Sequence, residues 1–120
     1  MGKAQQFEDL LAWQKARALT SQIHQLVHRS GLNHDFGLRN QMQRAAVSIM
    51  SNIAEGFERG SKREFGRFLL IAKGSCGELR SQLYVALDAE YVTQAQFESL
   101  TSQSAKVSRM LSGLHKSIRE

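Results

Sequence analysis

The stretch that decides the fold runs from Lys62 to Ala89 and reads KREFGRFLLIAKGSCGELRSQLYVALDA. Its apolar and small residues recur in alternating steps of four and three: Phe65, Leu69, Ala72, Cys76, Leu79, Leu83 and Ala86. Because an α-helix has about 3.6 residues per turn, this spacing places them all on one face and forms a heptad seam. The stretch is therefore predicted to be one long helix, over residues 62–89, that packs against other helices.

The residues before this helix predict where it begins and where a second helix ends. Arg59-Gly60-Ser61 interrupts the periodicity, and Ser61 can cap the helix, with Glu64 three residues on as the partner of a capping box. The second helix is expected over residues 35–58, with Asp35 as its N-cap. Its apolar stripe is Leu38, Met42, Ala46, Ile49 and Ile53.

Two further helices are expected, one at each end of the chain. The first spans about 7–29 and is followed by a stop signal at Ser30-Gly31-Leu32-Asn33. Its stripe is Ala12, Ala16, Leu19, Ile23 and Leu26. Thr93 opens the last helix, at about 93–119. The stripe of that helix is Phe97, Leu100, Ser104, Val107, Leu111, Leu114 and Ile118.

Together these helices predict an all-α, antiparallel, up-down-up-down four-helix bundle forming one domain over residues 1–120. The connections are short, which makes neighbouring helices antiparallel, and the absence of proline fits long uninterrupted helices. The single cysteine, the lack of a signal peptide at the start and the lack of a long apolar run predict a cytoplasmic chain with no membrane segment.

Several short sequence motifs of this chain occur together in one known family. They are Leu11-Ala12-Trp13-Gln14-Lys15-Ala16, Phe36-Gly37-Leu38, Arg44-Ala45-Ala46-Val47-Ser48-Ile49 and Asn52-Ile53-Ala54-Glu55-Gly56. With them, the chain from about Phe7 to Ile118 resembles the four-helix bundle proteins of the 23S rRNA intervening-sequence (S23) family. A relative of that family is the accessory variability determinant of diversity-generating retroelements. The resemblance implies the same fold and a homo-oligomeric ring, with a pentamer favoured.

One position departs from the family pattern. Met50 stands where relatives often have proline, in the Ser-Ile-Pro-Ser-Asn form of the motif. Because proline kinks a helix, we expect the second helix to be straighter here.

Apolar residues outside the stripes suggest self-association. Trp13, Met50, Phe68 and Ile71 fall off or widen the predicted core faces and are the expected oligomer interface. The alternative is a wide core stripe with a few ordinary exposed side chains.

Polar residues near the end of the second helix and the middle of the third suggest a buried network. Asn52 and Glu55 lie one helical turn apart, and Ser75 and Glu78 are expected at a similar level on the neighbouring helix. A network of these side chains, with Arg44 or Arg67 as counter-charge, would fix the helix register. The alternative is a pair of carboxylates for acid–base chemistry or metal binding.

The sequence contains no pattern that indicates an enzyme, so we expect no catalytic residues, no metal and no cofactor. His24 and His28 are spaced as a metal pair could be, but they lack further ligands, and solvated histidines are the simpler interpretation. Cys76 lies on the heptad seam and is expected to be a small buried residue.

Clustered basic residues suggest the function. The chain has 16 Lys and Arg against 11 Asp and Glu, a net charge of +5. The candidate nucleic-acid-binding residues are Arg59, Lys62, Arg63, Arg67, Lys73, Lys106, Arg109 and Lys116. Such clusters neutralise phosphates without reading bases, so RNA or DNA is the expected partner, with no preference between them indicated.

Two alternatives to nucleic-acid binding stay open. The basic residues can form an ordinary solvated helix face. The chain can instead be a protein scaffold or adaptor, for example for a reverse transcriptase or a ribosome-associated partner.

Overall fold

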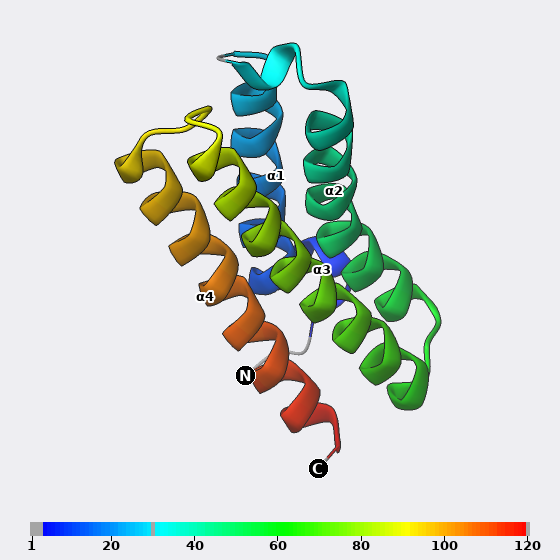
Figure 1. Ribbon diagram of the computed structural model, residues 1–120. Coiled ribbons are helices and arrows are strands. Elements are labelled where there is room, and N and C mark those ends of the chain that lie inside the picture. Colours follow the sequence, from blue (N-terminus) through cyan, green and yellow to red (C-terminus); the bar gives the residue numbers. More distant parts are fainter. Residues whose placement is uncertain (1–3, 30, 120) are drawn as a thin grey trace.

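The computed structural model describes residues 4–29 and 31–119 and contains four α-helices and two short 3-10 helices. They are η1 (Phe7–Asp9), α1 (Leu11–Val27), η2 (Gly31–Asn33), α2 (Phe36–Glu58), α3 (Lys62–Asp88) and α4 (Gln94–Arg119). Consecutive helices run in opposite directions (Figure 1). The predicted all-α, up-down-up-down four-helix bundle is confirmed. Residues 1–3, Ser30 and Glu120 lie outside the described residues, and with them part of the predicted stop signal.

The boundaries of α2, α3 and α4 agree with the sequence to within about one residue, but α1 is shorter than the predicted 7–29. Ahead of it, the carboxylate of Asp9 accepts hydrogen bonds from the backbone N–H groups of Gln5 and Gln6, at 3.0 and 3.2 Å. These bonds hold η1 as a separate turn. Leu10 is then extended, with φ −74° and ψ 124°, so the α-helix begins only at Leu11.

Side-chain caps fix where the later helices begin. The backbone N–H of Leu38 donates to Asp35 Oδ1 at 3.2 Å, and that of Glu64 donates to Ser61 Oγ at 3.1 Å, as predicted. Thr93 and Gln96 form a complete reciprocal box at the start of α4. At Ser61 only half of the predicted box forms, because the Glu64 carboxylate pairs with Arg67 instead.

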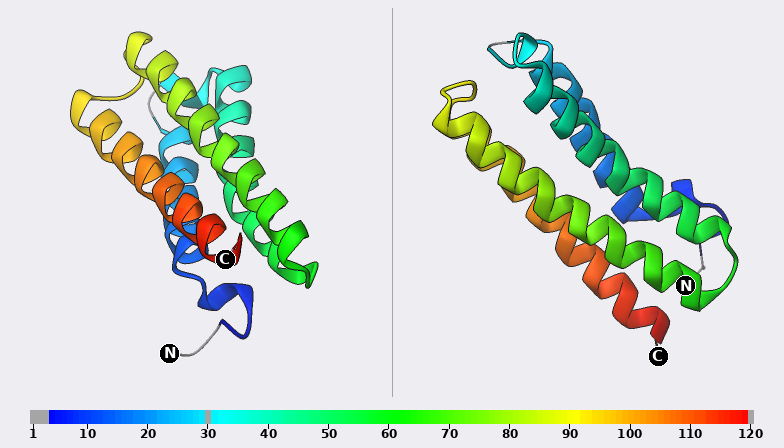
Figure 2. Two further views of the ribbon diagram at one scale, coloured as in Figure 1. Left: turned by 90° about the horizontal axis from the view of Figure 1, so that it is seen from below. Right: turned by 45° about the vertical axis from the view of Figure 1, so that its right-hand side comes forward.

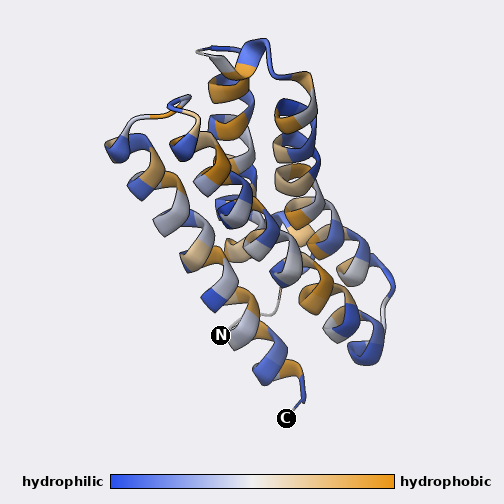
Figure 3. Cartoon of the chain, viewed as in Figure 1, coloured by the Kyte–Doolittle hydropathy of each residue, from blue (hydrophilic) through white to orange (hydrophobic). Residues whose placement is uncertain are grey.

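The core lies on the predicted stripes. α3 lies between α2 and α4 and contacts both, while α1 lies behind it and packs mainly on α2 and less on α4 (Figures 1 and 2). Apolar and hydrophilic segments alternate along each helix, as one-sided burial requires (Figure 3). The largest fully buried side chains include Leu19, Ile23, Met42, Ile49, Ile53, Leu69, Leu79, Leu83 and Leu111.

α2 and α3 approach each other closely at Gly56. A Cβ on Gly56 would lie only 2.6 Å from the Cβ of Phe68, so a glycine is required for this separation of the helices. The ring of Phe68 fills the space over Gly56 and keeps only 6% of its surface exposed. The expectation that Phe68 is a spare, exposed interface residue is therefore wrong for the isolated chain.

The loops at the opposite end of the bundle are joined by Tyr91. Its hydroxyl donates to Asp35 Oδ2 at 3.0 Å, which raises the pKa of the phenol. Its ring occupies the space that a side chain at Gly31 would need, since a Cβ there would lie 2.4 Å from the ring. The α1–α2 and α3–α4 connections are thereby held together.

Candidate functional site

A cationic groove lies between the first turns of α3 and the last turns of α4. We call it the α3–α4 groove; it has a volume of about 390 Å³. Its lining residues are Lys62, Arg63, Gly66, Arg67, Leu70, His115, Ile118 and Arg119. Because α3 and α4 are antiparallel, the start of one lies beside the end of the other (Figure 2). The groove thus combines two segments of the chain that are about fifty residues apart.

Helix geometry explains why these side chains share one groove. Lys62, Arg63, Gly66, Arg67 and Leu70 are three or four residues apart, so they line one side of α3. Gly66 forms part of the floor, and a Cβ there would be 3.5 Å from the imidazole of His115. Gly66 is itself buried, and the side chains of His115 and Ile118 lie over it.

Among the described residues, the charge of the α3–α4 groove is only partly compensated, because Arg67 alone of its four cations has an ion-pair partner. Four of its lining residues are Lys or Arg, and none is Asp or Glu. Within residues 4–29 and 31–119, Lys62, Arg63 and Arg119 form no ion pair. The N-terminus of α3 adds the positive end of a helix dipole, which also favours an anion.

On the other side of α3, towards α2, the basic residues are paired with carboxylates. Arg59 lies 2.9 Å from Glu55 and 3.6 Å from Glu64, and Arg67 lies 3.2 Å from Glu64. The hydrogen bond from Arg67 lowers the pKa of Glu64, and the one from Arg59 to Glu55 raises the pKa of Arg59. We call this set, together with Phe68, the α2–α3 ion-pair cluster.

Phe68 organises this cluster. The guanidinium carbons of Arg59 and Arg67 lie 5.0 and 4.6 Å from the centre of its ring, in cation–π contact. Arg59 and Arg67 are therefore held by carboxylates and by an aromatic face at once. Among the predicted phosphate-binding residues, Arg59 and Arg67 are thus the ones whose charged groups already have partners within the protein. Arg67 also lines the α3–α4 groove.

The remaining predicted basic residues are spread around the bundle. Lys73 follows Gly66 by two turns of α3 and extends the same side of the helix. At 100° per residue, Lys106 points about 180° away from His115, so it does not belong with the groove. Arg109 and Lys116 lie between these directions, on the outer face of α4. His115 itself was not predicted; only the pairing of α3 with α4 reveals it.

The predicted polar network is partly wrong. Asn52 Nδ2 donates to the carbonyl and the hydroxyl of Ser48, at 2.8 and 2.9 Å, and Ser48 Oγ lies 2.8 Å from Ser75 Oγ. Ser48, which was not predicted, joins Asn52 to Ser75. Glu55 and Glu78 are exposed and take no part, because burying a carboxylate without a strong partner is costly.

The outward side of the α2–α3 pair carries unmatched polar groups. Gln82 is only 8% exposed, and its side-chain oxygen has no hydrogen-bond partner among the described residues. It lines a shallow groove of about 480 Å³ together with Arg44 and Glu78. Neither of these charged groups forms an ion pair within the described part of the chain. We call this the outer α2–α3 face.

Of the predicted interface residues besides Phe68, only Ile71 is well exposed, at 41%. Trp13 and Met50 are half-buried and pack against the core. Six other apolar side chains, which were not among the predicted interface residues, are more exposed than Ile71. They are Leu11, Phe36, Val47, Leu70, Tyr84 and Val85. Whether any of them contacts another copy of the chain stays a prediction.

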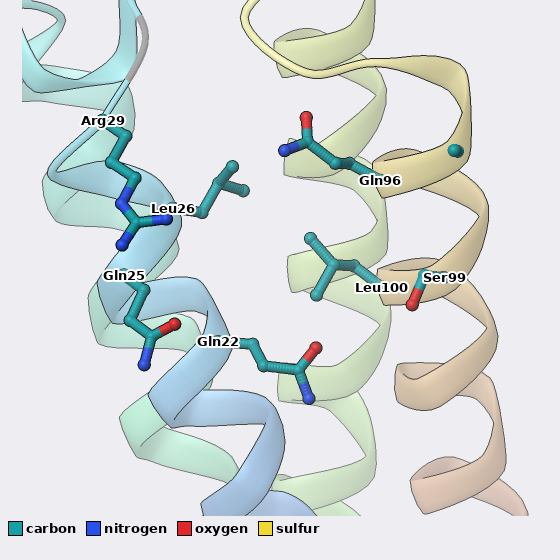
Figure 4. Close-up of a pocket in the computed structure, with 8 residues that line it drawn as sticks. Gln22, Gln25, Leu26, Arg29, Gln96, Ser99 and Leu100 are labelled. Atoms are coloured by element: carbon teal, nitrogen blue, oxygen red, sulfur yellow. The ribbon is translucent and has the colours of Figure 1, made fainter.

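A third groove lies between the end of α1 and the start of α4, with a volume of about 400 Å³ (Figure 4). Leu26 and Leu100 form its apolar floor, and amide side chains surround it. Gln22 and Gln103 exchange two side-chain hydrogen bonds of 2.9 and 3.0 Å, which tie α1 to α4. Arg29 is the one charged lining residue, so this groove has little to attract an anion.

The histidine and cysteine side chains show no catalytic arrangement in the described residues. His28 Nδ1 lies 2.7 Å from the carbonyl of His24, which uses that ring nitrogen within the helix. No group of three or more potential metal-ligating side chains occurs in residues 4–29 and 31–119. Burial raises the pKa of the Cys76 thiol to about 11, so it is un-ionised at neutral pH. None of the helices described has the length and apolarity that crossing a bilayer requires.

Comparisons with known proteins agree with this architecture. A family model described as 23S rRNA-intervening sequence protein matches residues 8–113. The fold is similar to that of a protein with unknown function from the S23 ribosomal protein family of Bacteroides thetaiotaomicron VPI-5482, with a TM-score of 0.80 and 25% identity. That alignment covers 88% of this chain and 96% of the other. No curated protein matches this chain.

Proposed function

We propose a function for the α3–α4 groove of this chain, which belongs to the 23S rRNA-intervening sequence protein family, as its sequence motifs indicated. The protein is a cytoplasmic, non-enzymatic bundle that binds the phosphate backbone of RNA or DNA, without sequence preference. The observation that carries this proposal is the set of cations at Lys62, Arg63 and Arg119, which share one groove and form no ion pair within the described part of the chain.

The physical basis is counterion release. Each phosphate that a Lys or Arg neutralises frees condensed counterions, so affinity falls steeply with salt. Cations already paired with carboxylates contribute less, which is why the groove supports the proposal better than Arg59 does. The family's name connects its members with ribosomal RNA, which makes an RNA backbone a reasonable first ligand.

A salt titration tests the proposal. We expect log affinity for a labelled RNA or DNA to fall linearly with log salt, with a slope of about −0.7 to −0.9 per phosphate contacted. The double variant Arg63→Glu/Arg119→Glu should lose most of the binding and of the slope. Lys106→Glu/Arg109→Glu is the matched control, because it also reverses two charges, at residues of α4 that do not line the groove. Equal losses in both variants would show that net charge, rather than the groove, governs binding.

We also propose self-association through the outer α2–α3 face, with the pentameric ring of the resemblance as the expected form. Among the described residues, the opposite charges of Arg44 and Glu78 form no ion pair, and the buried side-chain oxygen of Gln82 has no hydrogen-bond donor. Exposed Val47 and Ile71 flank them. A second copy could supply Glu to Arg44 and Arg to Glu78, and a ring would multiply the number of cationic grooves.

Charge reversal tests this association. Arg44→Glu and Glu78→Arg should each shift the mass measured by light scattering towards the monomer. The double variant should restore the oligomer, because opposite charges face each other again. A monomeric wild type would overturn the self-association. A pull-down dominated by one other protein and insensitive to nuclease would assign this face to a protein-scaffold role.

A further inference from the structure

The α3–α4 groove contains apolar surface that phosphate binding alone does not need. Leu70 is 52% exposed, and it lies in the groove with Arg63 and Arg67. Ile118 and the imidazole of His115 are half-buried and line the other wall. A surface that only neutralises phosphates would be lined by Lys, Arg and small polar side chains. The combination of cations with apolar and aromatic surface points to a ligand with both charge and a flat apolar part.

The groove is small and open to solvent on one side. Its volume of about 390 Å³ is near the lower end of the usual range for small-molecule sites. A nucleic-acid duplex presents phosphates and sugars on its outside and keeps the faces of its bases stacked inside. An unpaired strand presents its base faces, and these stack on aromatic, His and Arg side chains.

We propose that the α3–α4 groove binds an unpaired nucleic-acid strand. A base lies against Leu70, Ile118 and the His115 ring, while the adjoining phosphates are neutralised by Lys62, Arg63 and Arg119. This inference rests on the proposed function, because the same cations attract the phosphates. It adds that the groove distinguishes single strands from duplexes.

Gly66 is buried beneath the two side chains that would face the base. A Cβ there would have the His115 ring and Ile118 as its nearest neighbours, at 3.5 and 3.6 Å. These are ordinary contact distances, so the backbone position tolerates an alanine. A larger side chain would displace His115 and Ile118 from the groove wall without changing any charge. Substitution of Gly66 therefore separates the groove as a binding cavity from the field of its cations.

The experiment compares a labelled ten-nucleotide single strand, the duplex of the same sequence and an abasic single strand, at one ionic strength, as RNA and as DNA. We expect wild type to bind the single strand about tenfold tighter than the duplex or the abasic strand, since one stacked base contributes about 1–3 kcal/mol. Gly66→Leu should remove this preference and leave duplex affinity within about twofold. Leu70→Ser should reduce it several-fold.

Matched controls make the result interpretable. Gly74→Leu introduces the same side chain into the same helix where nothing lies within 4 Å, and it should change neither affinity. Circular dichroism and thermal unfolding confirm that Gly66→Leu is folded; if it is not, Leu70→Ser and the abasic strand decide. Equal binding of single strand, duplex and abasic strand overturns this inference and leaves phosphate binding intact. Failure of wild type to bind any of them at low salt overturns the proposed function as well.

Discussion

Basic residues lie on both sides of the first turns of α3, but only those on the side of α2 are surrounded by carboxylates. Towards α2, Arg59 and Arg67 are paired with Glu55 and Glu64 and rest on the face of Phe68. Towards α4, Lys62, Arg63 and Arg119 form no ion pair among the described residues. In the sequence all of these except Arg119 form one cluster, which the rotation of the helix divides between two neighbours. The position of the countercharges, rather than the number of cations, distinguishes the side held within the fold from the side that we propose binds phosphates.

The glycines at the two helix contacts, α2 with α3 and α3 with α4, also differ. Gly56 lies under Phe68 where α2 and α3 are in contact, whereas Gly66 lies under His115 and Ile118 where α3 and α4 are in contact. Packing requires a glycine at the first position, while the second has room for a Cβ. Paired substitutions can therefore test whether the two sides differ as described.

The largest effect is expected from alanine at these two glycines. Gly56→Ala places a Cβ 2.6 Å from the Cβ of Phe68, which forces the helices apart and should destabilise the fold by about 2 kcal/mol. Gly66→Ala meets only ordinary contacts and adds helix propensity, so it should be neutral or stabilising by up to about 1 kcal/mol. Urea unfolding measures both. Equal costs at the two positions would contradict the comparison.

The next effect concerns binding. Arg63→Gln removes a cation that forms no ion pair among the described residues and should weaken RNA binding about tenfold, with a salt slope reduced by about one. Arg59→Gln removes a cation already held by Glu55 and Glu64, and should weaken binding less than about threefold. Fluorescence anisotropy across a salt series measures both. A larger loss at Arg59 would place the binding surface on the side of α2.

The smallest effect is the acid response of the α2–α3 ion-pair cluster. Because Arg67 lowers the pKa of Glu64 in the folded state, the carboxylate stabilises the fold above its unfolded pKa, and this stabilisation is lost as pH falls through the folded value. Glu64→Gln should therefore melt below wild type at pH 7, and the gap should close below about pH 4. Thermal unfolding between pH 7 and pH 3 measures it. A gap independent of pH would mean that the lost contact is not ionic.

Most of the fold was predictable because its signals are local. The heptad seam of α3 needs only the spacing of apolar residues, and the caps at Asp35 and Ser61 need only a polar side chain and the N–H groups that follow it. The predicted start of α1 was too early, and the reason is also local. The Asp9 carboxylate accepts hydrogen bonds from the backbone N–H groups of Gln5 and Gln6 and forms a separate turn, which the spacing of apolar residues does not reveal.

The site was less predictable because it depends on which helices meet. The burial of Phe68 follows from a glycine twelve residues earlier, on another helix. Ser48 completes the link between Asn52 and Ser75, although its own helix stripe gives no indication of it. His115 enters the groove only because the end of α4 packs beside the start of α3. Spacing along one helix contains none of this information.

The chain's single cysteine has a practical consequence for such experiments. Cys76 is fully buried, and burial raises its pKa to about 11, so the folded protein presents no reactive native thiol to solvent at neutral pH. A cysteine introduced at Lys73, beside the groove, would be the one accessible thiol and would accept a fluorophore without prior mutagenesis of the background. Cys76 would react with the fluorophore only when the protein unfolds, so labelling of a second thiol would report unfolding in the same experiment.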